Sequence, residues 1–350
     1  MKKLAYILPV HLDHDGIAIK VAGQVATLNP YYDTRLIQLQ YHRESSLLQK
    51  IWAWFQFEYR SFWALFTCPI VYIRYNHKTP FILLISTLLS YFKIIYIEHN
   101  TKVVSELRFL KSYGELISHY GCLLLLRFGK HTHLAVNAEL QRTLIAQKLP
   151  QNRVIYCQNG YMPPTVRSET SSLIVDTLHY WASNFEKIAI FSGNGYPWHG
   201  IELIQSLFKH YPHVGIIVVG PYSTQSQAHS QSFYTGKVDI PTLVSLYAIA
   251  DFAISTFRWD LLSITEGSPL KTRDYLCHGL PILTHYYDCA ADFDALKPYI
   301  FNYQDDKDRA ISDIIEHTHP KSTVKETAIR LLSWENLWRL NRIIISDTLV

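Results

Sequence analysis

The sequence predicts an α/β protein built from two doubly wound parallel-sheet domains in tandem. Short β-branched and aromatic runs alternate with longer helical patterns along the whole chain. Most of these runs are apolar along their entire length, which is typical of strands in a parallel sheet covered by helices on both faces. The chain has 350 residues, more than one hydrophobic core usually organises, so we expect two domains.

In the first half, strands and helices alternate from the amino terminus. We expect strands at Leu4–Val10, Arg35–Leu39, Ile70–Arg74, Ile94–Glu98, Leu134–Asn137 and Val154–Gln158. We expect helices at Ile17–Leu28, Leu47–Phe66, Phe81–Phe92 and Ala138–Leu149. The first run ends at Pro9, which is typical of a strand rather than a signal peptide. The apolar stretch Phe81–Phe92 falls short of the roughly 20 residues that span a membrane, so it predicts a buried helix.

The second half repeats this alternation. We expect strands at Ile188–Phe191, Gly215–Val219, Phe252–Thr256 and Pro281–Thr284, and helices at Ile201–His210, Ile240–Ala250 and Leu270–His278. The proline-containing, polar stretch Met162–Asn184 reads as a linker, and Ser322–Ile345 is amphipathic. The domains are therefore expected at residues 1–165 and 185–333.

Composition excludes several classes of protein. Hydrophobic residues make up 48% and charged residues 18%, which argues against disorder. The net charge of +4 is dispersed and includes no basic tail, so we expect no nucleic-acid partner. The five cysteines form no C-x-x-C pair and indicate a reduced compartment. We therefore expect a cytoplasmic protein.

The segment from Glu266 to Pro281 carries the clearest chemical signal. Ser268 suits a helix N-cap and Pro269 the first helical position. The free N–H groups and the dipole of such a helix start favour an anion such as a diphosphate. Glu266 and Asp274 are spaced so that both carboxylates can accept hydrogen bonds from sugar hydroxyls.

Those residues resemble a known family. The spacing from Glu266 to Asp274 resembles the E-x7-E signature of retaining GT-B glycosyltransferases of the large family four group. "SPLKTRDYLCHGLPIL" is similar to the S-P-x-K-x-x-E-Y-x-x-x-G-x-P segment of members that build bacterial polysaccharides. "FSGNGYPWHGIELI", "CQNGYM" and "DGIAIKVAGQVATL" resemble further family segments. All of these matches occur in family order along the chain.

The resemblance implies two Rossmann-like domains that face each other across a cleft, with the end of the chain (334–350) packed back on the first domain. It implies transfer of a sugar from a nucleotide-sugar donor to a glycan or lipid-linked acceptor, with retention and without metal or cofactor. The first domain would bind the acceptor and the second the donor. Glu266 and His99 would be catalytic, and the donor would be bound by Asp274, Ser268, Pro269, Lys271, Asn194, His199, Gly16 and Val238.

Two positions depart from the family pattern. Asn194 and His199 stand where the family has arginine and lysine on the diphosphate, and neither residue carries a full charge at neutral pH. Lys271, Arg258 or Arg273 could supply the missing charge. The alternative is a non-catalytic homologue that acts as the partner of an active transferase. A third reading is another nucleotide-sugar enzyme of the same architecture, such as an epimerase.

Other residues have plainer readings. Asp292 and Asp294 have the D-x-D form of metal-dependent transferases, but they follow the last expected strand of the sheet, so we expect no metal site. Glu98 points away from His99 along a strand and is a weaker site candidate. The aromatic stretch Ile51–Phe66 is typical of a core helix. The alternative is a face that meets the inner surface of the membrane as a peripheral contact.

Overall fold

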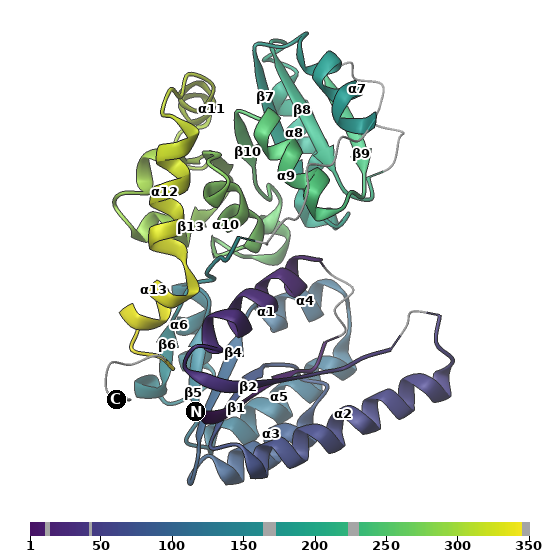
Figure 1. Ribbon diagram of the computed structural model, residues 1–350, viewed down its shortest axis with the longest axis vertical. Coiled ribbons are helices and arrows are strands. Elements are labelled where there is room, and N and C mark those ends of the chain that lie inside the picture. The colour runs from purple at the N-terminus through teal and green to yellow at the C-terminus, as the bar shows by residue number, and fades with distance from the viewer. Residues whose placement is uncertain (11–14, 42–43, 164–172, 223–230, 345–350) are drawn as a thin grey trace. The chain divides into compact units, whose positions relative to one another are not determined.

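The computed structural model describes residues 1–10, 15–41, 44–163, 173–222 and 231–344. The chain divides into two compact units. Unit 1 comprises the described parts of Met1–Met162 and Trp334–Val350, and unit 2 those of Pro163–Ser333. Both units are layered α/β structures (Figure 1).

Unit 1 is built on a six-stranded sheet in the order β2-β1-β3-β4-β5-β6, and every neighbouring pair of strands is parallel. The strands are β1 (Lys2–Leu8), β2 (Tyr32–Gln38), β3 (Ile70–Arg74), β4 (Ile94–His99), β5 (Thr132–Ala135) and β6 (Val154–Tyr156). The helices are α1 (Asp15–Leu28), α2 (Leu47–Thr67), α3 (Pro80–Leu89), α4 (Val103–Phe109), α5 (Tyr113–Arg127), α6 (Ala138–Ala146) and α13 (Trp334–Leu340), with a 3₁₀ turn at η1 (Gln151–Arg153).

The two faces of this sheet differ in chemistry. On one face, aliphatic side chains such as Ile7 and Ile73 pack with α2, α3, α5 and α6 in one hydrophobic core. The alternate strand positions place Tyr6, Tyr72 and Glu98 under α1, where they bond to polar side chains. Their sequences suggested strands that are apolar on both faces. The structure instead shows one apolar face and one face with polar contacts.

The end of the chain returns to unit 1. Helix α13 contacts α1, and the ring of Trp334 lies 3.4 Å from where a Cβ would stand on Gly23. The Tyr31 hydroxyl donates to Glu335 Oε1 (2.8 Å), and the Tyr32 hydroxyl donates to the carbonyl of Ile344 (2.6 Å). These contacts place the carboxy-terminal helix beside the first helix of the chain.

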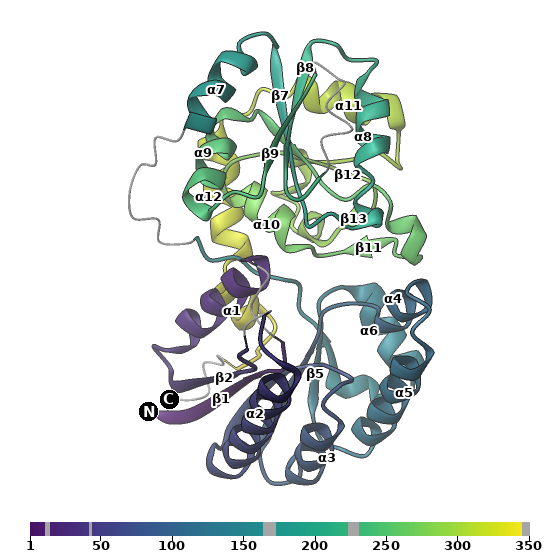
Figure 2. The same ribbon diagram turned by 90° about the vertical axis from the view of Figure 1, so that its right-hand side faces the viewer.

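Unit 2 repeats the layered plan (Figure 2). Its six-stranded sheet has the order β14-β12-β10-β7-β8-β9, all parallel, and β11 pairs with β13 separately. The strands are β7 (Lys187–Ser192), β8 (Val214–Val219), β9 (Ser232–Gly236), β10 (Phe252–Ile254), β11 (Glu266–Gly267), β12 (Ile282–Thr284), β13 (Tyr287–Asp288) and β14 (Ile300–Asn302). The helices are α7 (Leu173–Ala182), α8 (Ile201–Phe208), α9 (Ile240–Ile249), α10 (Leu270–Cys277), α11 (Lys307–Ile315) and α12 (Lys321–Leu332), with 3₁₀ turns at η2 (Pro197–His199), η4 (Trp259–Leu262), η5 (Cys289–Asp292) and η6 (Lys297–Tyr299).

The predicted class of two parallel-sheet α/β domains is confirmed. Every expected strand overlaps an observed one, with ends displaced by a few residues. The patterns did not predict α4 and α5, and the stretch read as a linker contains α7, while residues 164–172 lie outside the described ranges.

Two expectations about burial hold for only one side of each helix. The helix expected at Phe81–Phe92 buries Ile82 and Leu83 but leaves Phe81 and Leu88 exposed. The aromatic helix α2 likewise packs Phe57 in the core but presents Trp52 and Trp63 to solvent. In the part of the chain that the structure describes, no helix has both the length and the hydrophobicity to cross a membrane.

Candidate functional site

The strand order of unit 2 locates a candidate site. From β7 the chain first runs outward through β8 and β9, then crosses to the other side of β7 and continues through β10, β12 and β14. In open parallel sheets, ligands bind at the carboxyl ends of the strands where the order reverses. Here that point lies between β7 and β10, and the turn after β7 and the start of α10 lie beside it.

The turn after β7 is tightly packed. A Cβ at Gly193 would lie 2.6 Å from Nδ1 of His199, and a Cβ at Gly220 would collide with the carbonyl of Gly193. His199 is buried, and its Nδ1 lies 2.8 Å from the hydroxyl of Tyr222. Burial and the nearby Lys271 keep the pKa of His199 far below its usual value. His199 is therefore neutral and contributes no positive charge.

The start of α10 differs slightly from its sequence prediction. Pro269, not Ser268, is the N-cap residue, and the helix begins at Leu270. Ser268 is buried just before it. The glycine before Ser268 is required sterically, because a Cβ at Gly267 would overlap the indole ring of Trp259. The close approach of Trp259 thus fixes the path of the chain into the helix.

Lys271 lies in the first turn of α10. Its Nζ is buried, has no hydrogen-bond partner among the described residues, and lies 4.5 Å from the centroid of the Phe191 ring. Burial lowers the pKa of Lys271 to about 7. A buried ammonium without an acceptor is unfavourable, and an anion beside it would restore the charged form. A cationic side chain and a helix start therefore meet at this edge.

The other two candidate cations are already paired. Arg273 forms a fully buried ion pair with Asp288, which also accepts a hydrogen bond from the hydroxyl of Thr272 (2.8 Å). Arg258 is partly exposed and lies 3.1 Å from Asp260. Of the three proposed replacements for the missing family charge, Lys271 alone has no carboxylate partner in the described part of the chain.

The ion pair of Arg273 also positions the first carboxylate. Asp288 belongs to β13, and β13 pairs with β11, which carries Glu266. The strand that holds Glu266 is thereby tied to α10. Glu266 is partly buried, and its Oε1 accepts from the thiol of Cys289 at 3.7 Å.

Asp274 is held from two sides. Its Oδ2 accepts a hydrogen bond from the Tyr247 hydroxyl (2.6 Å), and its Oδ1 lies 3.2 Å from Nδ1 of His278. Although burial opposes protonation, Asp274 raises the pKa of His278. A carboxylate has about four acceptor sites, so Asp274 can still accept further hydrogen bonds. Tyr247 and His278 carried no sequence signal, because both read as ordinary helix residues.

The remaining predicted residues are more scattered. Asn194 is exposed in the turn after β7, and Val238 is half-buried just before the N-cap residue of α9. Gly16 is exposed in the first turn of α1 and belongs to unit 1, as does His99. Ser268, Pro269 and Lys271 therefore lie together at the start of α10, with His199 near Lys271.

His99 lies in a buried cluster of histidines. Its Nε2 lies 3.2 Å from Nδ1 of His133, and its ring stacks on Tyr75, with 4.8 Å between ring centroids. Burial, together with the neighbouring His119, lowers the pKa of His99 to about 3. A neutral histidine whose Nε2 is engaged favours a structural role in the core.

Unit 1 contains a second buried lysine that sequence reasoning missed. Lys20 Nζ donates to Asn100 Oδ1 (2.5 Å) and Asn159 Oδ1 (2.6 Å), and it lies 2.7 Å from Glu98 Oε1. The Lys20 Nζ also lies 5.5 Å from the ring centroid of Trp334. The partners of Lys20 are far from it in the sequence, so no short sequence motif could predict this network.

Asp292 and Asp294, which have the D-x-D form but were not expected to bind metal, contact other side chains. Asp292 accepts from the Tyr287 hydroxyl (2.7 Å), and Asp294 pairs with Lys297 (2.6 Å). Over the described residues, no group of three histidine, cysteine or carboxylate side chains is arranged to hold a metal ion.

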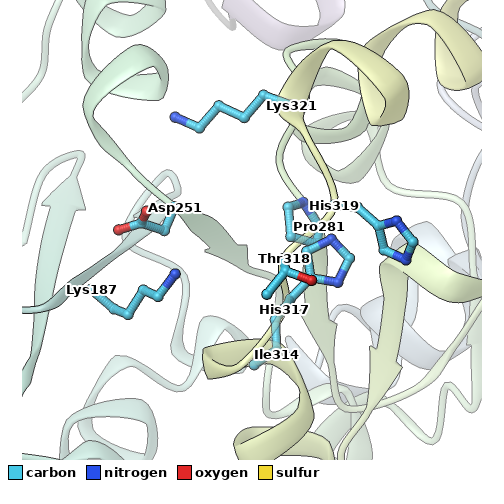
Figure 3. A pocket seen from close by; sticks show the side chains of 8 residues that line it. All are labelled: Lys187, Asp251, Pro281, Ile314, His317, Thr318, His319 and Lys321. Atoms are coloured by element: carbon cyan, nitrogen blue, oxygen red, sulfur yellow. The ribbon is translucent and has the colours of Figure 1, made fainter.

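A cavity of about 350 Å³ lies elsewhere in unit 2. It opens at the amino ends of β7, β10 and β12, lined by Lys187, Asp251 and Pro281 together with residues that precede and begin α12 (Figure 3). None of the predicted site residues lines it. Gly16 and His99 belong to unit 1, and the candidate site of unit 2 lies at the opposite, carboxyl ends of the strands.

Comparison with solved structures shows similarity over nearly the whole chain. HepE from Anabaena, in complex with UDP and glucose, matches with a TM-score of 0.62 and 13% identity over 98% of each chain. Sucrose-phosphate synthase from Thermosynechococcus elongatus matches with a TM-score of 0.66 and 11% identity over 96% of each chain. WaaG, a glycosyltransferase involved in lipopolysaccharide biosynthesis, matches with a TM-score of 0.58 and 11% identity over 97% of each chain.

The sequence matches no protein-family profile and no curated protein sequence. At these identities the structural similarity shows the fold, which is GT-B, and not the reaction. One fold can support several reactions, so the function has to be argued from the site.

Proposed function

We propose that this protein is a glycosyltransferase that moves a sugar from a nucleotide-sugar donor, bound by unit 2, to a glycan or lipid-linked acceptor. The observation that carries the proposal is Lys271. Its buried Nζ has no partner among the described residues and lies at a helix start, at the strand reversal of the sheet. A diphosphate would supply the missing negative charge there.

The roles of the carboxylates follow from their positions. Glu266, next to the start of α10, would accept hydrogen bonds from donor-sugar hydroxyls, and Asp274, one turn into the helix, would bind the ribose. Because Tyr247 and His278 hold Asp274 from the protein side, its carboxylate would be pre-oriented. HepE and this chain share the fold, and HepE binds UDP, which supports a nucleotide site in unit 2.

The finer chemistry rests on the sequence. The E-x7-E resemblance supports transfer with retention and without metal, in bacterial surface-polysaccharide synthesis. Lys271 and the N–H groups of α10 would offset the charge of the leaving diphosphate and so stabilise the transition state electrostatically. We place the protein in the cytoplasm, with peripheral contact at the inner membrane face.

A second candidate is a non-catalytic homologue that supports an active transferase. It is favoured by the neutral His199 and the neutral Asn194, which leave one cation where the family has more. Such a protein would bind a nucleotide weakly and would transfer no sugar.

Calorimetric titration with UDP, GDP and ADP, followed by assays of the matching nucleotide-sugars, tests the proposal. We expect one diphosphate to bind, and Lys271→Met to weaken it by at least about tenfold, since a charged contact is lost. Lys297→Met, which removes an exposed lysine, is the matched control. Glu266→Gln should preserve nucleotide binding and lower turnover by about a hundredfold or more.

The outcomes separate the candidates. Release of nucleotide diphosphate with a new glycosidic bond supports the transferase. Binding without turnover supports the non-catalytic homologue, and interconversion of the sugar without transfer indicates an epimerase. If no nucleotide binds the wild type, the assignment of this edge as a donor site is wrong.

A further inference from the structure

Three neighbouring helices of unit 1 present an apolar outer surface, which we call the α2–α3–α5 face. Helix α2 packs on α3 and α3 packs on α5, in a layer along one side of the sheet (Figure 1). The inward sides of these helices fill the core. Their outward sides have no partner in the described part of the chain, yet they are rich in large apolar residues.

On α2 the exposed apolar residues form one line along the helix. They recur every three or four residues, which keeps them on one side of a helix. They are Leu48, Trp52, Phe55, Tyr59, Trp63 and Phe66, all about half or more exposed. The core side of the same helix is formed by other residues, including Phe57 and Leu65. Helix α2 is therefore apolar on two opposite sides, and packing against the sheet explains only one.

The same pattern continues across the other two helices. Exposed residues Phe81, Leu84 and Leu88 follow the outer side of α3, and Tyr91 and Phe92 follow directly after it. On α5 and its C-cap residue the exposed apolar residues are Tyr113, Ile117, Tyr120, Leu124 and Phe128. A contiguous surface of this kind on a soluble domain marks an interaction site.

The charges around this face are mainly basic. Helix α3 contains no charged residue. At the edges, Lys130 is exposed and lies 5.0 Å from the ring centroid of Tyr91. The ammonium of Lys93 is instead held by backbone carbonyls, including those of Leu65 (2.7 Å) and Cys68 (3.1 Å). Arg60 and Arg127 are exposed. Long basic side chains at the rim of an apolar surface can reach anionic headgroups while their stems cover apolar area.

The two acidic side chains near the face, Glu115 and Glu58, carry little uncompensated negative charge. Glu115 is paired with Lys78 and His77. Burial raises the pKa of Glu58, on α2, to about 7. Both arrangements reduce repulsion from a negatively charged surface.

We propose that the α2–α3–α5 face lies on an anionic lipid bilayer, with its aromatic rings among the headgroups and the exposed Arg60, Arg127 and Lys130 at the rim. A protein partner fits less well, since protein interfaces carry about one hydrogen bond per 100–200 Å². The exposed positions of α3 offer only apolar side chains. Tryptophan, tyrosine and phenylalanine with nearby lysine and arginine are typical of helices that lie in a membrane interface.

This inference rests on the membrane contact included in the proposed function. Vesicle flotation tests it without any assay of the reaction, so a failure here would leave the proposed sugar transfer untouched. The full chain is mixed with vesicles of phosphatidylcholine, or with vesicles in which about a third of the lipid is phosphatidylglycerol. We expect binding to the anionic vesicles, weaker binding to the neutral ones, and partial loss at high salt.

The decisive variant is Trp52→Ser with Phe55→Ser. Both side chains are 60% exposed, so their loss should leave the melting temperature unchanged and weaken vesicle binding at least about tenfold. The matched control is Tyr180→Ser with Leu340→Ser, two exposed apolar residues on α7 and α13, which should bind as the wild type does. If the double variant does not fold, Arg60→Glu with Arg127→Glu replaces it and should abolish the preference for anionic lipid.

Three results would overturn the proposal. The first is a wild type that binds neither kind of vesicle. The second is an equal loss of binding in the control variant. The third is a wild-type dimer in solution that Trp52→Ser with Phe55→Ser converts to a monomer without vesicle binding by either protein, because the face would then join two copies of the chain.

Discussion

The two units each bury a lysine, and the two lysines have opposite surroundings. Lys20 in unit 1 has Glu98 and two amide oxygens within hydrogen-bonding distance. Lys271 in unit 2 lies over the ring of Phe191 and near the neutral His199, and its Nζ has no hydrogen-bond partner in the described residues. Burial lowers the pKa of both amines, to about 8 for Lys20 and to about 7 for Lys271.

This difference separates a structural charge from one available to a ligand. Burial acts to raise the pKa of Glu98, but Lys20 and Arg74 outweigh it and hold the pKa below its usual value. Both partners of the Lys20 pair therefore stay charged near neutral pH, and each compensates the other. Lys271 has no such compensation, so its charge is costly until an anion arrives.

The largest effect is expected from Lys20→Met. The substitution leaves Glu98 buried without its main counter-charge, which should destabilise unit 1 by about 3–5 kcal/mol. Because the chain has two compact units, a single two-state transition cannot be assumed, and stability is best followed by hydrogen exchange of the β1 and β4 amides during urea unfolding.

The double variant Lys20→Met with Glu98→Gln is the control for this prediction. It removes both charges, so much of the lost stability should return. If the single variant is as stable as the wild type, Lys20 is not the counter-charge of Glu98, and the contrast between the two lysines fails.

Whereas Lys20→Met should lower the stability of the folded protein, Lys271→Met should raise it. Methionine can pack on Phe191 without burying a charge, so the ligand-free protein should gain on the order of 2 kcal/mol near pH 7. The gain should shrink as the pH rises towards about 10. Between a folded pKa of about 7 and an ordinary unfolded value, the unfolded chain binds more protons, and the stability of the wild type therefore rises with pH in that window. Thermal unfolding across this range measures the effect.

The same variant should lose nucleotide binding, so stability and function would change in opposite directions. In the wild type, affinity for a nucleoside diphosphate should fall from about pH 6 to about pH 8 as free Lys271 loses its proton. Lys271→Met should show no such fall. A variant that is destabilised at every pH would mean that the Lys271 amine is satisfied in the folded protein.

The fold could be predicted well because each strand or helix is indicated by residues that are neighbours in the sequence. A buried parallel strand such as Ile70–Arg74 is a run of apolar residues, and the observed β3 has the same bounds. The helix expected at Leu270–His278 is observed at Leu270–Cys277, and Gly279, two residues after its end, has φ of +88°. Helix α4 was missed because its seven residues are too few to show a helical period. Helix α5 was missed because apolar residues such as Ile117 and Leu124 lie on its exposed side and weaken the contrast with its buried side.

The candidate site was predictable only in part. The order of residues from Glu266 to Asp274 is local and could be read directly. That Arg273 is already paired, and so is not available to a ligand, could not be predicted. Its partner Asp288 lies on β13, outside the helix that carries Arg273. The aromatic stretch of α2 was read as core, since periodicity shows that residues share a face but not which face meets solvent.

The smallest effect is expected from Lys78→Met. This variant removes an exposed lysine of an ion pair and so provides a reference for the stability changes at the two buried lysines. Lys78 forms an ion pair with Glu115 (2.8 Å), but its side chain is 53% exposed and water already solvates the charge. The expected cost is at most about 1 kcal/mol and should decline further with added salt. Urea unfolding measured beside Lys20→Met would show whether burial, rather than ion pairing itself, determines the larger loss. A cost for Lys78→Met equal to that of Lys20→Met would mean that pairing alone sets the energy, and the argument from burial for Lys271 would lose its basis.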